Sequence, residues 1–151
     1  MYKKSITHYI SKVVVDILFY GSLLLTLLVP FISRWLFGWI SYEDSGYLTA
    51  FACILFVSGL CCAYILFNLK QMYRSLLVGN PFVDKNVRHL RKMAATCFVM
   101  AVIYIAKCLF MFTLATVVIA TIFVVGCLFC LTLKDLFKQA INYKTENELT
   151  I

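Results

Sequence analysis

Two cysteines three positions apart, Cys127 and Cys130, form the C-x-x-C spacing that thiol oxidoreductases use. On a helix this spacing places both thiols on one face. A redox pair also needs a water-accessible helix N-terminus and a partner cysteine with which to exchange. All seven cysteines of the chain instead lie within long apolar stretches. We therefore expect them to act as small hydrophobic residues, and we expect neither redox catalysis nor a structural disulfide.

Imidazoles for a metal site or for general-base catalysis are limited to His8 and His89. Both have basic neighbours, and neither has a nearby cluster of cysteines or carboxylates, so no zinc site or catalytic triad can be assembled. The chain also has no glycine-rich phosphate-binding loop. The sequence therefore predicts a protein that is not an enzyme, with no catalytic residue, no metal and no cofactor.

Three polar residues in or beside apolar stretches, Asp16, Asn68 and Lys107, are the remaining candidates for a chemical role. A charged residue inside a membrane suggests a functional role by default, because it is costly to place there. The structural alternative is that Lys107 snorkels to the outer interface, while water or Lys12 reaches Asp16 at the inner one. Asp16 and Lys107 would differ in height by about 15 Å, so no direct pair is expected. Asp16 and Asn68 are the better candidates for polar contacts between helices.

The elements that carry these residues are long apolar stretches, at 17–33, 45–69 and 93–133, the last interrupted only by Lys107. Each is long enough to cross a hydrocarbon core of about 30 Å at about 1.5 Å per residue. Hydrophobic residues make up 63% of the 151 residues, which leaves little material for a water-facing surface. We expect an integral membrane protein with a single membrane domain over residues 1–151.

The stretch 93–133 is too long for one crossing and has basic residues on both sides, so it must turn back within the membrane. We place the turn near Thr113 to Thr116. Basic residues also fill the N-terminus and the loop 70–92, whereas the loop 34–47 has one arginine against Glu43 and Asp44. The positive-inside rule then places both termini in the cytoplasm.

The predicted fold is all-α, an integral membrane four-helix bundle made of two helical hairpins. Its spans are about 13–33, 48–69, 93–111 and 116–136, with a cytoplasmic loop at 70–92 and a cytoplasmic tail at 137–151. The net charge of +7 is explained by cytoplasmic lysine and arginine that contact anionic lipid. We do not expect direct binding to nucleic acid.

The central loop contains the most specific local pattern. Gly79, Asn80 and Pro81 end the preceding helix. A short amphipathic basic helix then follows on the inner leaflet and leads into the third span. Its apolar arc holds Val83, Val87, Leu90, Met93 and Ala94, and its basic arc holds Lys85, Arg88, Arg91 and Lys92. The basic arc could serve lipid contact and orientation, or it could bind a partner.

The C-terminal tail is a candidate internal partner for that basic arc. Glu146, Glu148 and the terminal carboxylate could reach it and form an electrostatic latch. A disordered, solvated tail is the alternative expectation.

The Gly-Asn-Pro-Phe turn at 79–82, the residues that follow it at 86–91, the segment 135–140 and the ending YKTENELTI resemble a family of small bacterial four-span membrane proteins. This family is catalogued as domain of unknown function 2975. Its members carry Thr-Pro-Glu where this chain has Val83, Asp84 and Lys85, so the usual helix cap and proline first turn are missing. The resemblance implies a bacterial cytoplasmic membrane and, through frequent gene neighbours, a connection with small helix-turn-helix transcription regulators.

Two functional hypotheses remain open. In the first, the protein acts by interaction, and its cytoplasmic face binds or restrains a small helix-turn-helix regulator. In the second, the bundle transports a small solute or protects the membrane as an immunity protein, with Asp16, Asn68 and Lys107 as interior contacts. Membrane lipids are expected partners in both, and a homo-oligomer is compatible with either.

Overall fold

The computed structural model describes residues 6–40, 45–78, 82–110 and 112–149. All regular structure in these residues is α-helical. The four helices are α1 (Ile6–Ile40), α2 (Ser45–Val78), α3 (Asp84–Phe110) and α4 (Leu114–Leu149). The prediction of an all-α protein with four helices is confirmed.

Each helix contains a stretch that is long and apolar enough to cross a membrane. These stretches are His8–Ile32, Thr49–Leu77, Asp84–Phe110 and Leu114–Asn147. The helices extend beyond most of the predicted span ends, because hydropathy marks only the apolar part of a helix that continues into polar surroundings. The 35 residues of α1, for example, correspond to about 52 Å of helix, whereas the hydrocarbon core measures about 30 Å.

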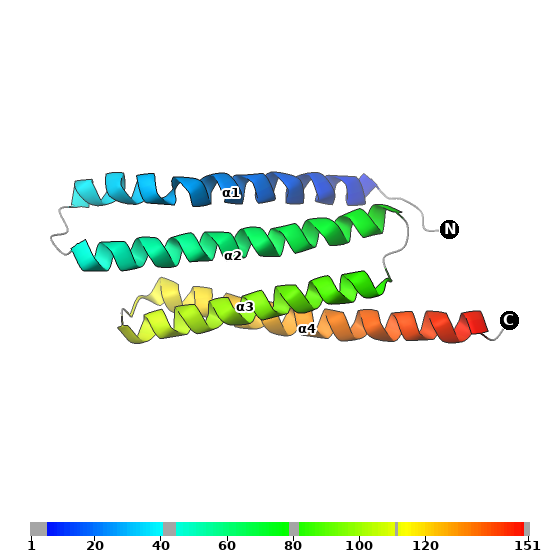
Figure 1. Cartoon of the computed structure of the whole chain (residues 1–151). Coiled ribbons are helices and arrows are strands. Elements are labelled where there is room, and N and C mark those ends of the chain that lie inside the picture. Colours follow the sequence, from blue (N-terminus) through cyan, green and yellow to red (C-terminus); the bar gives the residue numbers. More distant parts are fainter. Residues whose placement is uncertain (1–5, 41–44, 79–81, 111, 150–151) are drawn as a thin grey trace.

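The helices form two antiparallel hairpins, α1 with α2 and α3 with α4, which meet through α2 and α3 (Figure 1). Among the described residues, α1 packs only against α2, and α4 packs only against α3. The four helices therefore lie in the order α1, α2, α3, α4, each in contact with the next. Within the ranges that the structure describes, α1 does not contact α4. Both hairpins have their open ends at the same end of the molecule, where α1 begins and α4 finishes (Figure 1).

α3 is the most buried helix, with eight buried residues along its length. Two clusters form the core between α3 and its neighbours, one around Met93, Ala94 and Cys130, the other around Met100, Tyr104 and Ala120. Most other large apolar side chains are exposed on the outside of the molecule. Apolar side chains on the outside of a protein are expected when the surroundings are lipid, because lipid tails are as apolar as the core.

The α1–α2 pair depends on one glycine. A Cβ atom added at Gly59 of α2 would overlap the side chain of Thr26 of α1. Thr26 is 3% exposed, and its hydroxyl donates to the Ser22 carbonyl at 2.7 Å. Small residues allow helix backbones to approach closely in membranes, so Gly59 sets the spacing of this pair.

The turn between the last two helices lies between Phe110, where α3 ends, and Leu114, where α4 begins, slightly before the predicted position. The Thr113 carbonyl accepts hydrogen bonds from the backbone N–H groups of Thr116 at 2.8 Å and Val117 at 3.3 Å. Thr113 therefore occupies the capping position at the start of α4, where a carbonyl accepts the first helical bond. No glycine or proline is needed, because a threonine at this position can begin the helix.

The amphipathic segment of the central loop is not a separate helix but part of the helix that forms the third span. α3 begins at Asp84 and continues without interruption to Phe110, so residues 84–92 are its first turns. The Val83 carbonyl accepts a bond from the Asn86 N–H at 2.9 Å, which starts the helix without the usual threonine and proline. These turns and the third span form one continuous helix (Figure 1).

The C-terminal segment is helical as far as Leu149, in place of the expected disordered tail. Phe137 anchors its first part, with its ring centroid 5.4 Å from that of Phe82. The last turns of α4 extend beyond the start of α3 instead of folding back (Figure 1). The Glu146 side chain is exposed there, while the side chain of Glu148 and the terminal carboxylate lie outside the described residues.

Candidate partner-binding site at the basic end

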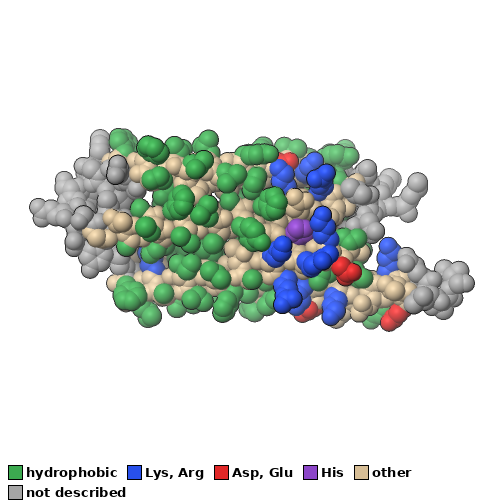
Figure 2. All heavy atoms as spheres, in the orientation of Figure 1, with side chains coloured by type: hydrophobic (Ala, Val, Ile, Leu, Met, Phe, Trp, Pro, Cys, Tyr) green, Lys and Arg blue, Asp and Glu red, His purple; other side chains and the backbone are tan. Residues whose placement is uncertain are grey.

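Most charged side chains of the described residues gather at the end of the molecule where α1 and α3 begin and α2 and α4 finish, which we call the basic end (Figure 2). Figure 2 shows lysine and arginine side chains concentrated there, while hydrophobic side chains cover most of the remaining visible face. The first turn of α1 and the last turn of α4 both lie at this end (Figure 1). Such a distribution matches the charge pattern from which the sequence predicts a cytoplasmic face.

The first turns of α3 expose four cations. We call this set, Lys85, Arg88, Arg91 and Lys92, the basic surface. The opposite side of the same turns is buried, with Leu90 only 2% exposed and Asn86 only 1% exposed. The sequence predicted the basic arc but missed Asn86, because a polar residue is not expected on the packed side of a helix.

A polar contact fixes these turns against α2. Asn68 is 1% exposed, and its Oδ1 lies 2.8 Å from Nδ1 of His89. Its amide nitrogen donates to the Tyr64 carbonyl at 2.8 Å. An amide oxygen only accepts, so His89 donates from Nδ1. Nε2 of His89 is buried without a hydrogen-bond partner among the described residues.

Asp16 forms a second polar contact, between α1 and α2. Its Oδ1 lies 3.0 Å from Nζ of Lys70, and the two side chains are 29% and 28% exposed. Lys70 also donates to the Tyr20 hydroxyl at 3.4 Å and lies 5.2 Å from the centroid of the Phe19 ring. The contact joins two helices, as expected for Asp16, and its cation is Lys70 of α2 in place of Lys12 of the same helix.

Lys107 lies in the last turn of α3, at the end opposite the basic surface. Its Nζ is 4.9 Å from the centroid of the Phe51 ring and 5.9 Å from that of Tyr104. A cation over aromatic faces is stabilised electrostatically. The structure thus separates Lys107 from Asp16 and Asn68, and the three residues do not form one pathway.

An apolar pocket of about 220 Å³ lies at the basic end, on the packed side of the first turns of α3. Its walls come from α2, α3 and α4, and are Leu69, Met72, Tyr73, Leu76, Asn86 and Phe137. Asn86 belongs to the same turn of α3 that carries Lys85 and Arg88. The basic end therefore combines a cationic surface with a hollow of a size that suits one large apolar side chain.

The thiols and imidazoles do not assemble in the described part of the chain. All seven cysteines are free, and Cys97 and Cys130 are buried between α3 and α4. Within residues 6–40, 45–78, 82–110 and 112–149, no three His, Cys, Asp or Glu residues are grouped as metal ligands.

Four long apolar helices, with lipid-facing exteriors and a charged end, define a multi-pass membrane protein. The chain matches the family described as Protein of unknown function (DUF2975) over residues 12–151, and it belongs to that family. The resemblance noted from the loop and tail motifs is thereby confirmed. No curated protein and no solved structure matches the chain.

Proposed function

We propose that this protein is an integral membrane interaction protein of the bacterial cytoplasmic membrane that binds or restrains a small soluble helix-turn-helix regulator. The observation that carries the proposal is the basic surface. It consists of four exposed cations on turns of α3 whose other side is packed and hydrogen-bonded.

Rigid presentation supports a binding role. The contact between Asn68 and His89 and the burial of Leu90 hold the backbone of these turns in place. A preorganised surface loses less conformational entropy when a partner binds. Lipid contact alone would not require this rigidity, because flexible basic segments are attracted to an anionic leaflet equally well.

The pocket at the same end of the molecule supplies the second feature that a protein partner needs. Buried apolar anchors dominate binding energy in interfaces, whereas charges at the rim mainly steer association and select the partner. The 220 Å³ pocket can accept one such anchor, and the basic surface on the other side of the same turns favours a partner that also carries an acidic patch. The class of partner comes from the family resemblance, which implies small helix-turn-helix regulators.

Transport is less well supported, because the three intramembrane polar residues do not line a common path. Asp16 is engaged by Lys70 and Asn68 by His89, and Lys107 lies near the other end of the bundle. A solute pathway would need polar groups at successive depths.

Site-specific photo-crosslinking tests the proposal. A benzophenone amino acid replaces Asp84, at the start of the basic surface, and a matched control carries it at Val118, an exposed apolar position of α4. Irradiation of native membranes followed by mass spectrometry should recover a small DNA-binding protein from position 84 and not from position 118. Recovery of lipid alone from both positions would overturn the proposal.

A further inference from the structure

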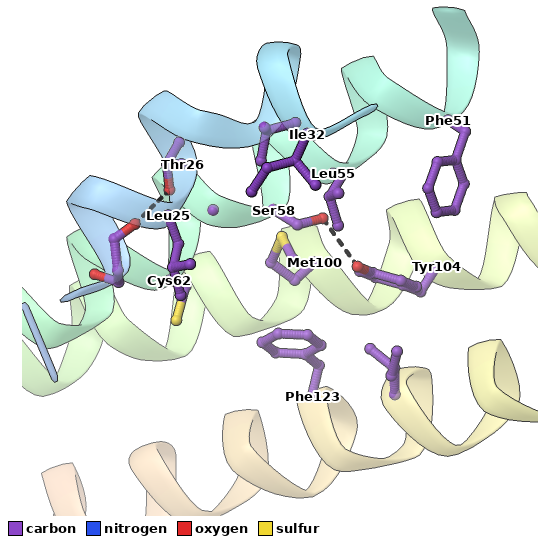
Figure 3. Close-up of a pocket in the computed structure, with 14 residues that line it drawn as sticks. Leu25, Thr26, Ile32, Phe51, Leu55, Ser58, Cys62, Met100, Tyr104 and Phe123 are labelled. Carbon is purple, nitrogen blue, oxygen red and sulfur yellow. Dashed lines mark hydrogen bonds between the residues drawn. The ribbon is translucent and has the colours of Figure 1, made fainter. Parts of the chain in front are cut away.

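A second cavity, of about 520 Å³, lies between the two hairpins in the half of the molecule away from the basic end. All four helices contribute to its walls, including Leu25 of α1, Leu55 of α2, Met100 of α3 and Phe123 of α4 (Figure 3). The cavity exists because α1 does not pack against α3 or α4 in the described chain. Its volume falls within the range of small-ligand sites.

The wall of this cavity is chemically apolar even where it contains hydroxyl groups. Thr26 donates to the Ser22 carbonyl at 2.7 Å, and Ser22 donates to the Phe19 carbonyl at 2.8 Å. Ser58 donates to the Ile54 carbonyl at 2.7 Å, and Tyr104 donates to the Ser58 hydroxyl at 3.0 Å (Figure 3). Every hydroxyl donor on the wall is therefore used within the protein. A polar solute entering the cavity would lose its hydration without compensation.

Lys107 is not itself a wall residue of the cavity, but its positive charge lies close to two residues that are. Phe51 and Tyr104 both line the cavity, and Nζ of Lys107 lies 4.9 Å and 5.9 Å from the centroids of their rings. Among the described residues, no carboxylate lies within ion-pair distance of Lys107. An ammonium group without a carboxylate, beside an apolar cavity, is complementary to an amphiphile with an anionic head.

The length of the cavity agrees with a single extended chain. Its wall on α2 runs from Phe51 to Cys62, which is about 16 Å at helical rise. An apolar chain gains little from leaving lipid for an apolar cavity, because the two surroundings are similar. A specific ligand is therefore distinguished from bulk lipid by its head group and by the fit of its single chain to the cavity.

We propose that this cavity binds a long-chain fatty acid, with the hydrocarbon chain between the hairpins and the carboxylate at Lys107. The site uses residues of this chain that the regulator surface does not involve, and the inference stands independently of the proposed function.

Equilibrium binding of radiolabelled palmitate to the full chain in detergent micelles tests the site. Lys107→Met should weaken palmitate binding about tenfold and leave the binding of uncharged hexadecanol unchanged. Leu55→Trp, which fills the cavity, should weaken both ligands. Lys138→Met, at the opposite end, is the matched control and should weaken neither. Each variant must first remain monodisperse, and Lys107→Met alone keeps the test decisive if Leu55→Trp does not fold.

Three results would overturn the proposal. The first is equal binding of palmitate to Lys107→Met and the unaltered protein, and the second is equal affinity for palmitate and hexadecanol. The third is displacement of palmitate by an equal concentration of an anionic phospholipid. That result would show that the cavity is a groove for bilayer lipid.

Discussion

Asn68 and His89, 21 positions apart, join α2 to α3 through a 2.8 Å contact between Oδ1 and Nδ1. Asn68 lies in the second helix, near its basic end, and His89 lies among the four cations of the basic surface. The contact therefore sets the height and rotation at which α3 presents those cations. A polar pair inside the bundle links the membrane part of the protein to the surface proposed to bind the regulator.

Replacing Asn68 with leucine should lower the free energy of unfolding by about 1–2 kcal/mol, because the buried Nδ1–H of His89 loses its acceptor. Unfolding in mixed micelles of a mild detergent and SDS, followed by tryptophan fluorescence, measures this change. Asn142→Leu, at an exposed position of α4, is the matched control and should change the free energy little. Equal effects of the two substitutions would contradict a structural role for the Asn68–His89 contact.

The ion pair between Asp16 and Lys70 should contribute less than the Asn68–His89 contact, since both of its side chains are partly exposed. We expect Asp16→Asn to lower the free energy of unfolding by less than Asn68→Leu does. A double-mutant cycle with Lys70→Met isolates the pairwise part of this energy. Regulator recovery should be unchanged in Asp16→Asn, whereas in a transporter this substitution would abolish function.

Gly59 should tolerate no larger residue while Thr26 is present. We expect Gly59→Ala to lower the free energy of unfolding by about 1–3 kcal/mol, because the added methyl group overlaps the Thr26 side chain. Gly21→Ala is the control, since a Cβ there meets nothing within 4 Å. Thr26→Ala should restore part of the stability lost in Gly59→Ala. A failure of this rescue would show that the close α1–α2 approach is not the cause.

The basic end is predicted to face the cytoplasm. A cysteine at Thr113, in the turn at the opposite end, should react with a membrane-impermeant maleimide added to intact cells. A cysteine at Asn142 should react only after the cells are permeabilised. The unaltered protein gives the background from its seven native cysteines. The reverse pattern of labelling would contradict the orientation and, with it, the cytoplasmic regulator.

The sequence predicted the helices well because apolar stretches report directly on contact with lipid. It underestimated the lengths of α1, α2 and α4, since hydropathy does not register the parts of a helix that continue into water. The basic surface was predicted because Lys85, Arg88, Arg91 and Lys92 follow the helical period within one element.

The contacts between elements could not be predicted in the same way. Pairing Asp16 with Lys70 requires the relative height and rotation of two helices, which no local pattern specifies. The available signal was that both residues fall near the same end of adjacent antiparallel spans. The cavity near Lys107 was also missed, because it results from the contact that α1 does not make with α4 in the described chain.

The central claim is that the basic surface binds a regulator, and charge replacement within it is the most direct test. Lys85, Arg88, Arg91 and Lys92 are changed together to glutamine, and a control chain carries the same change at four other basic-end cations, Lys12, Arg74, Lys138 and Lys144. Crosslinking pull-down from native membranes, quantified by mass spectrometry, compares both with the unaltered protein. Regulator recovery should fall about tenfold in the first variant, equivalent to about 1.4 kcal/mol of binding free energy, and little in the control. Equal recovery from all three proteins, or recovery of lipid without any DNA-binding protein, would contradict the account.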